Sequence, residues 1–207
     1  MANLSERALV AYGLKDIFFG EYGYSSSTGK ITYANQNVLG RGITATFELK
    51  FAEGRLYSSG VLSRFKKIVT GGSISLNVEA LTLAVQKSLF AATETSTTVG
   101  SGTVTGIGYS SSTTGRYVGV ATYVPADEAS GDKYICVFVR KAMFGPPSMS
   151  YQTAGESITW NTPTTTGEFL APDKLTGEAD VPMIEIAEAD TEADAIAWCK
   201  AQLGWSS

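Results

Sequence analysis

The clearest pattern of hydrophobic and polar positions covers residues 43–51, where apolar and polar side chains alternate one by one. This alternation is typical of a β-strand that buries one face and exposes the other. A second strand of this kind is predicted over residues 73–79, with Ile74, Leu76 and Val78 on its buried face. The first half of the chain therefore indicates half-buried strands.

Two later segments, 117–124 and 134–142, are apolar on both faces. Such runs are typical of central strands that are covered on both sides. The segment between them, residues 125–133, is rich in Asp and Gly and is predicted to be a turn. Further short strands are predicted between Gly and Pro clusters, at 14–20, 156–160 and 167–171.

Two short helices are predicted beside these strands. Leu81, Val85 and Leu89 recur at helical spacing directly after the strand at 73–79,. A second helix is expected after Asp190. Its start resembles a capping box and its end has a glycine at the position that ends many helices. The residues concerned are Thr191 and Asp194 at the start, Gly204 at the end, and an expected stripe of Ile196, Lys200 and Leu203.

These elements predict a mainly β protein, built as two packed antiparallel sheets or a rolled β-barrel, with one internal helix and a short C-terminal helix. A chain of 207 residues can bury a sizeable core in one domain,. We expect a β domain over residues 1–171 and an acidic extension with the short helix over residues 172–207.

Histidine is absent from the whole sequence. Catalytic Ser-His-Asp and Cys-His pairs and His-based zinc sites are therefore excluded. Cys136 and Cys199 are far apart and have neither metal-ligand nor redox-motif spacing,. We expect one of these thiols in the core and the other on a helix face.

Three other motifs carry no chemistry. The glycine loop at residues 23–30 has the wrong spacing for a phosphate-binding loop, and Ile31 stands where Ser or Thr must reach magnesium,. The acidic turn at 127–132 lacks the order of a calcium loop. No pair of acids is singled out for glycosidase chemistry. We expect no enzyme activity, no catalytic residues, no cofactor and no metal.

The N-terminal residues include Glu6, Arg7, Lys15 and Asp16, so they lack the apolar core of a signal peptide,. No run of apolar residues approaches the roughly 18 needed to span a bilayer. We expect a protein that is made in the cytoplasm without membrane insertion.

Residues 52–72 show no clear strand or helix pattern. A structureless segment of this length is unusual inside a compact domain and is usually functional. Its single acid, Glu53, is outnumbered by four bases, which gives a local charge of +3, and apolar side chains lie among them. Apolar and basic residues on a long loop indicate a surface for a partner. The bases are Arg55, Arg64, Lys66 and Lys67, and the apolar residues include Tyr57 and Phe65.

Residues 168–207 have the opposite character, with nine acids and two bases. The two charged regions allow two interpretations. They are either ordinary solvated faces or the two halves of a head-to-tail contact between copies of the chain. In the second case, added salt should weaken self-association.

The order of these elements resembles that of the major tail proteins, or tail tube proteins, of long-tailed bacteriophages with non-contractile tails. The resemblance is one of pattern over most of the chain. It is carried by residues 12–19 (YGLKDIFF), 72–81 (GSISLNVEAL), 134–142 (YICVFVRKA), 156–163 (ESITWNTP) and 166–169 (TGEF).

The resemblance implies that six subunits form a ring, that rings stack into a tube, and that DNA leaves the virion through this tube. It implies as partners the same chain, a tape-measure protein, a tail terminator and a distal tail protein, with double-stranded DNA only passing through. It also implies that a long loop contacts the next ring. By position, candidate ring-stacking contacts are Tyr57 and Phe65 as apolar contacts and Arg55, Arg64, Lys66 and Lys67 as ionic contacts,.

Two other function classes remain as alternatives. A carbohydrate-binding or adhesin β-sandwich could use the 10 Tyr and 3 Trp residues as stacking platforms. A hydrolase that relies on carboxylates alone would need a close pair with separated pKa values in a cleft. Glycan binding without self-association would favour the first, and two facing acids in a deep pocket the second.

Overall fold

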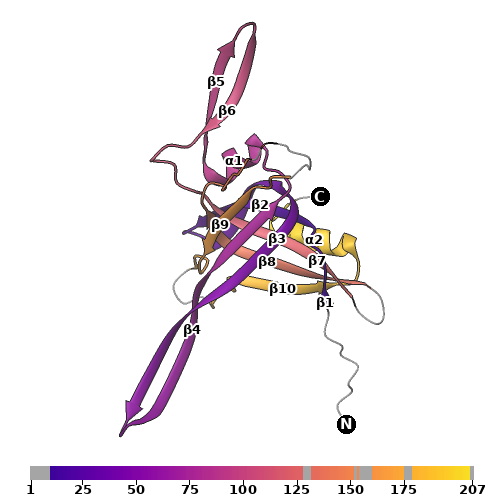
Figure 1. The fold of residues 1–207 in the computed structure, drawn as a ribbon. Coiled ribbons are helices and arrows are strands. Elements are labelled where there is room, and N and C mark those ends of the chain that lie inside the picture. The colour runs from indigo at the N-terminus through magenta and orange to yellow at the C-terminus, as the bar shows by residue number, and fades with distance from the viewer. Residues whose placement is uncertain (1–9, 128–131, 152, 154–159, 175–178, 206–207) are drawn as a thin grey trace.

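A computed structural model describes residues 10–127, 132–151, 153, 160–174 and 179–205. Within these residues the protein is mainly β, with an eight-stranded antiparallel sheet, a separate two-stranded sheet and two helices (Figure 1). The elements are β1 (Val10–Ala11), β2 (Asp16–Ser25), β3 (Lys30–Ser58), β4 (Val61–Val78), α1 (Leu83–Phe90), β5 (Thr93–Val99), β6 (Gly102–Gly108), β7 (Tyr117–Asp127), β8 (Lys133–Phe144), β9 (Thr164–Phe169), β10 (Ile184–Ala189) and α2 (Glu192–Gln202).

The large sheet rolls up into a barrel. Its strand order is β1-β7-β2-β3-β4-β9-β8-β10, and β7 also pairs with β8. This extra pairing joins β7, β2, β3, β4, β9 and β8 into a closed ring of six strands. Of the two predicted arrangements, the rolled barrel is therefore the one observed. β1 and β10 remain outside the ring as the end strands of the sheet.

The barrel interior holds the larger hydrophobic cluster. Ile74, Leu76 and Val78 are buried there, as the period-two pattern predicted. α1 adds Val85 and Leu89 to the same cluster. Its N-terminus is capped by the Thr82 hydroxyl, which accepts a hydrogen bond from the Val85 backbone N–H,. The predicted internal helix is thus confirmed.

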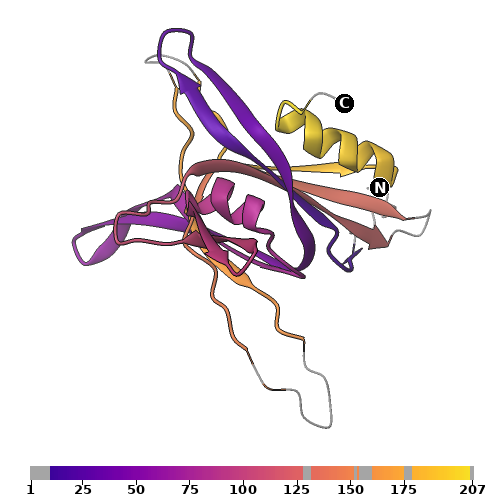
Figure 2. The ribbon, with the colours of Figure 1, turned by 90° about the horizontal axis from the view of Figure 1, so that it is seen from above.

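A second cluster lies on the outer face of the sheet under α2. Figure 2 shows the two helices on different sides of β7 and β8. The Thr191 cap is confirmed, since its hydroxyl accepts from the Asp194 N–H. The predicted stripe is wrong in detail, because the buried residues are Ala195, Cys199 and Leu203. The Ile196 and Lys200 positions are only half-buried.

Residues 184–205 belong to the folded body. β10 pairs with β8 along its whole length, and α2 completes the outer cluster. The predicted domain boundary at residues 171 and 172 stays a prediction, while β10 and α2 pack against the strands of the barrel. The two thiols, Cys136 on β8 and Cys199 on α2, are free and buried, and they contact each other in the outer cluster.

The other strand predictions differ in their limits. The strand expected at 14–20 runs over Asp16–Ser25, and the one at 167–171 runs over Thr164–Phe169. β7 continues through Pro125 to Asp127, so the turn predicted from residue 125 begins later. The strand predicted at 156–160 lies outside the described residues except for Trp160, which is not in a strand.

Two hairpins project from the barrel in different directions (Figure 1). One is formed by the ends of β3 and β4, and we call its residues 51–70 the arm. The other is the β5–β6 hairpin, which the sequence pattern did not predict. The expectation of a structureless loop at 52–72 is wrong, since these residues form a paired ladder from Phe51↔Val69 to Ser58↔Val61.

The arm leaves the barrel at a glycine. Gly72 pairs with Phe169 across the β4–β9 ladder, and a Cβ on Gly72 would collide with the Phe169 ring and with the Glu48 carbonyl oxygen. Only glycine allows this close approach. Phe169 itself is fully buried. The base of the arm is therefore fixed by core packing, while the rest of the arm is not.

Candidate assembly surface

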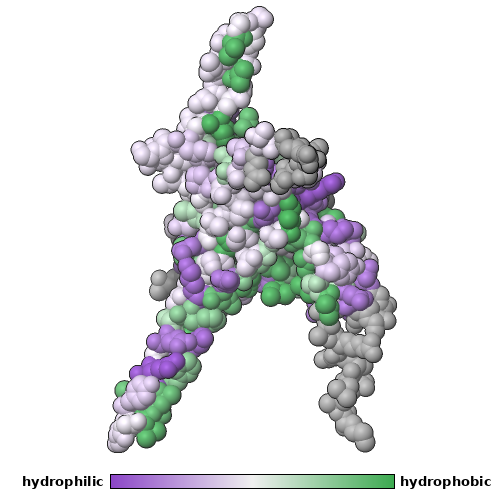
Figure 3. Space-filling model, in the orientation of Figure 1, coloured by the Kyte–Doolittle hydropathy of each residue, from purple (hydrophilic) through white to green (hydrophobic). Residues whose placement is uncertain are grey.

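Every residue of the arm is exposed, from 51 to 70. Large apolar side chains share this exposure, with Leu56 at 56%, Tyr57 at 60% and Phe65 at 51%. An isolated two-stranded hairpin is marginally stable in water. Figure 3 shows apolar and charged residues interspersed along the arm. This composition is typical of a surface that a partner covers.

Strand register divides the arm into two faces, because residues paired across an antiparallel ladder lie on the same face. On one face, which we call the aromatic face, Lys67 Nζ lies 4.3 Å from the centre of the Phe51 ring and Arg55 Cζ lies 5.5 Å from that of Phe65. Glu53 lies between these cations, 3.1 Å from Lys67 and 3.4 Å from Arg55. Glu53 therefore offsets one of the two positive charges of this face, which keeps a net charge of +1.

The opposite face, which we call the cationic face, contains Arg64 and Lys66. Arg64 pairs with Leu56, and Lys66 pairs with Gly54. Ile68, which pairs with Ala52, is 53% exposed on the same face. Among the residues that the structure describes, neither Arg64 nor Lys66 has an ion-pair partner. This face thus presents uncompensated positive charge beside exposed apolar side chains.

The six predicted contact residues all lie on the arm, but they do not form one patch. Arg55, Phe65 and Lys67 share the aromatic face, and Tyr57, paired with Leu62, follows them toward the tip. Arg64 and Lys66 lie on the other face. Phe51, Leu56 and Ile68 are further exposed apolar residues of the arm, and the six candidate contacts did not include them. Two register shifts in the ladder, between Lys50/Phe51 and Leu56/Tyr57, interrupt the alternation that would have identified them,.

The acidic C-terminal part of the chain is partly neutralised within the molecule. Ion pairs join Glu168 to Lys50, Asp173 to Lys141, Glu185 to Arg140 and Glu192 to Lys15. Each pair links this part of the chain to an earlier strand or its flanking residues. The acids therefore do not act as one uniform patch, and only some of them are available to a partner.

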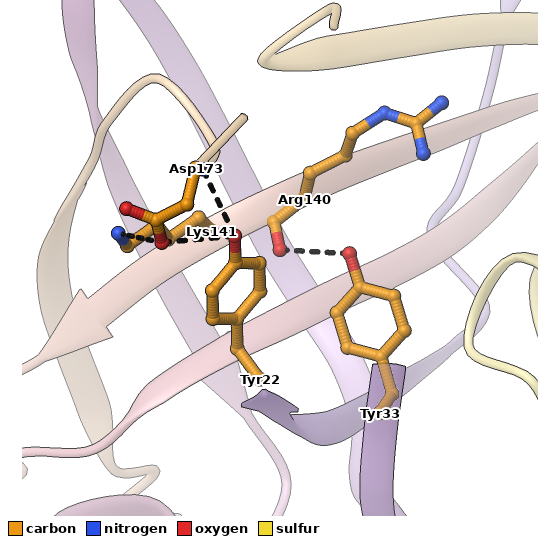
Figure 4. Close-up of polar contacts among 5 residues, drawn as sticks. All are labelled: Tyr22, Tyr33, Arg140, Lys141 and Asp173. Carbon is orange, nitrogen blue, oxygen red and sulfur yellow. Dashed lines mark hydrogen bonds and ion pairs between the residues drawn. The ribbon is translucent and has the colours of Figure 1, made fainter. Parts of the chain in front are cut away.

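The most developed polar cluster joins β2, β8 and the segment after β9 (Figure 4). The Tyr22 hydroxyl donates to Asp173 Oδ2 at 3.1 Å and accepts from the Asp173 backbone N–H at 3.0 Å. Lys141 Nζ lies 2.6 Å from the same carboxylate. On the neighbouring strand, the Tyr33 hydroxyl donates to the Arg140 carbonyl oxygen at 3.0 Å. These contacts attach the β2–β3 hairpin and the late segment to β8.

The protonation states in this cluster suit a structural role. Burial raises the pKa of Tyr22 to about 12, so its hydroxyl stays neutral and keeps donating. The hydrogen bond from Lys141 lowers the pKa of Asp173, which keeps the carboxylate charged,. A lowered carboxyl pKa is the opposite of what a general acid requires.

In four surface hollows of the described residues, at most one carboxyl side chain belongs to the described lining: Glu79, Glu168 and Asp180 line one hollow each, and the fourth has none. The described residues contain no group of three or more His, Cys, Asp or Glu side chains that could hold a metal ion. Trp198 packs on Phe138 and Trp205 on Phe18, so both stabilise the interface of α2.

The ends of the sheet are the other unusual part of the surface. β1 and β10 each pair with one strand only, so each has an open hydrogen-bonding edge among the described strands,.

None of the described helices has the length and apolar character that a membrane span requires. Compared with known proteins, the sequence matches no family model and no curated protein.

Proposed function

We propose that this chain is a virion structural subunit that self-assembles into stacked hexameric rings and so forms the tail tube of a long-tailed bacteriophage. The tube is the conduit through which DNA passes into the host cell. The number of subunits and the nature of the conduit come from the family resemblance. The structural support comes from the surface, above all from the arm.

The arm is the observation that carries the proposal. A monomer gains little from holding a long hairpin with exposed Leu56, Tyr57 and Phe65 in water. Burying one such side chain fully contributes about 1.5–3 kcal/mol. In a six-membered ring the same contact is repeated in every subunit, so a modest contact becomes a strong junction between rings. The arm therefore suits a repeated contact between copies.

The open edges of β1 and β10 support ring formation in the same way. Exposed edges promote pairing with other chains, and closed assemblies remove them. A ring places one subunit's edge beside another's, which covers both. The arm is built from β3 and β4, so it supplies the contact between rings from strands other than the two edge strands.

The charge of the chain suits a channel for DNA. With 16 Lys and Arg against 20 Asp and Glu, the subunit carries a formal charge of −4. Each retained phosphate contact adds salt-sensitive affinity, and a conduit must release its cargo. A net acidic wall repels the DNA backbone and keeps such contacts few.

Negative-stain electron microscopy of the purified full chain, over a concentration and salt series with light scattering for mass, tests the proposal. We expect rings or hollow tubes above a threshold concentration and a higher threshold at high salt. A protein that stays monomeric at all concentrations, also after seeding with tail tips or tail terminator complexes, would contradict it. Binding to glycans by such a monomer would favour the carbohydrate-binding alternative.

A further inference from the structure

The sheet extends beyond the barrel at the end opposite the arm. β2 pairs with β7 only from Val118 to Thr122, and beyond that point the neighbours of β7 are β1 and β8. We call β10, with residues 123–127 of β7 and 133–137 of β8, the overhang. One of its faces is covered by α2. The other face is continuous with the barrel interior through Val139.

The uncovered face of the overhang is mainly apolar, with one acid, Glu188, and with Lys133 at its end, where Lys133 pairs with Ala126. Ile186 pairs with Val137 and Glu188 pairs with Ile135, which in turn pairs with Val124, so all five share this face,. Ile186 is 67% exposed, Glu188 is exposed, and the three others are half-buried. Within the described part of the chain, Glu188 has no ion-pair partner.

The cationic face of the arm has the complementary composition. Its exposed apolar residues, Leu56 and Ile68, lie beside Arg64 and Lys66, which have no counter-charge among the described residues. Small residues at positions 52 and 54 leave the backbone accessible. Asp190, directly after β10, adds a second acid to the overhang. Its side chain is 86% exposed and forms an ion pair with Lys133 at 3.9 Å.

The two surfaces lie at opposite ends of one strand. Lys133, the first residue of β8, lies in the overhang, whereas Ala142 near its other end pairs with Phe169, which pairs with Gly72 at the base of the arm. The two surfaces are therefore separated by the length of β8 in one molecule, and a contact between them is made most simply by two molecules. Such a contact is head-to-tail, and it repeats without limit when it does not close on itself.

We propose that the cationic face of the arm docks on the uncovered face of the overhang of a second copy, with Arg64 and Lys66 next to Glu188 and Asp190. This inference rests on the proposed self-assembly and names the surfaces that make the contact between successive subunits along the tube. The apolar residues provide the contact area, and the four charges fix its register. The two bases and one acid of the aromatic face take no part in this charge register, and its exposed Tyr57 and Phe65 rings contribute apolar contact area at the junction between rings.

A charge-exchange experiment tests this pairing. One variant carries Arg64→Glu and Lys66→Glu, and a second carries Glu188→Lys and Asp190→Lys. Each alone places like charges in the contact, so we expect its assembly threshold to rise at least tenfold over wild type. An equimolar mixture restores opposite charges at every contact between unlike subunits. We expect tubes from the mixture at a threshold within about threefold of wild type.

A control reverses two charges on the other face of the same arm. Arg55→Glu with Lys67→Glu changes the charge by the same amount, and we expect this control to form tubes by itself, from which the Glu188→Lys and Asp190→Lys variant is excluded when the two are mixed. Circular dichroism and gel filtration must show that every variant is folded before mixing. If wild-type protein forms normal tubes but the mixture of the Arg64 and Lys66 variant with the Glu188 and Asp190 variant does not, the proposed pairing is overturned. The proposal that the protein forms tubes is then unaffected. Wild-type protein that forms no tubes would overturn both.

Zero-length carbodiimide cross-linking of wild-type tubes gives an independent readout. We expect a Lys66–Glu188 or Lys66–Asp190 cross-linked peptide in the mass spectrum that is absent from monomers. Two outcomes would overturn the proposal, because each would show a different occupant. In the first, Lys66 is cross-linked only to other carboxyl groups. In the second, Glu188 and Asp190 are cross-linked only to the N-terminal amine or to other lysines.

Discussion

The arm and the β5–β6 hairpin have the same architecture and opposite surfaces. Both are exposed two-stranded ladders that leave the barrel (Figure 1). The arm carries aromatic, aliphatic and cationic side chains, whereas the β5–β6 strands are built mainly from Thr, Ser and Gly. Only Val99 and Val104 among their residues count as large exposed hydrophobic side chains. A projecting hairpin is thus not by itself a contact surface. Its side chains determine whether a partner can bind it.

The two hairpins also differ in what holds them in shape. The arm uses interleaved cations, aromatic rings and Glu53 on one face. The β5–β6 hairpin pairs Ser96 with Thr105 and Thr98 with Thr103. β-branched Thr residues favour strands and stay compatible with water. The β5–β6 hairpin can therefore remain exposed, while the arm gains stability when it is covered.

Shortening each hairpin in turn tests this contrast most strongly. Replacing residues 51–70 with a two-residue Asn-Gly turn should abolish assembly, because it removes the whole proposed contact, and should leave a folded monomer. Replacing residues 96–105 in the same way should leave tubes. Electron microscopy and gel filtration measure both. Equal loss of assembly from the two deletions would show that the contrast between the hairpins has no functional meaning.

Single charges placed on each hairpin sharpen the comparison. Phe65→Glu should block tube extension, because about 1.5–3 kcal/mol of burial per subunit is lost and a charge is placed in the contact. Val104→Glu is the matched control, since Val104 is 60% exposed against 51% for Phe65. We expect it to assemble normally. Tubes of normal length from the Phe65 variant would remove this residue from the contact.

Core and arm phenylalanines should separate folding from assembly. Phe169→Ala empties a fully buried site in the barrel and should lower the free energy of unfolding by about 3–5 kcal/mol,. Phe65→Ala removes an exposed ring and should change monomer stability by less than about 1 kcal/mol while still raising the assembly threshold. Urea unfolding of the monomers measures both. A large loss of stability from the Phe65 variant would mean that the arm packs on its own barrel in solution.

The sequence predicted best those elements whose pattern is set by burial. Residues 73–79 alternate because one face lies in the barrel interior, and residues 117–124 carry apolar side chains on both faces because β7 is covered by both clusters. The arm and the β5–β6 hairpin were missed for the same reason. Neither is buried on either face, so no alternation marks them, and their strand structure is visible only in the paired ladders.

The sequence predicted which residues form the candidate surface, but it did not predict on which face of the arm each of them lies. Charge and apolar content identified residues 52–72, but only the register places Arg55 with Glu53 and leaves Arg64 and Lys66 on the other face. The acids of the C-terminal part illustrate the same point. Their sequence positions give no sign that Glu185 pairs with Arg140 and that Glu188, three residues later, has no described ion-pair partner.

The smallest expected effect concerns the cluster around Asp173, which belongs to the barrel and not to either hairpin. The pKa of Asp173 is lowered mainly by the hydrogen bond from Lys141. A carboxyl group with a lowered pKa stabilises the fold above its unfolded pKa, near 4, and this contribution is lost as the pH falls through the folded value. Asp173→Asn should therefore cost up to about 1 kcal/mol at pH 7, and this cost should shrink as the pH is lowered toward 2.

Urea unfolding at both pH values measures this difference. Because the pKa of Tyr22 is about 12, its hydroxyl remains neutral throughout and can still donate to the amide oxygen of the substituted side chain, so the variant isolates the ion pair with Lys141. Asp180→Asn is the control. Asp180 pairs with Lys174, but its side chain is 94% exposed, and solvated ion pairs contribute little to stability,.

An Asp173 variant with the same pH profile as wild type would show that the cluster does not stabilise the barrel. A loss of tube assembly by a folded Asp173 variant would extend the contact surface from the arm to the barrel wall and so weaken the contrast between the two hairpins.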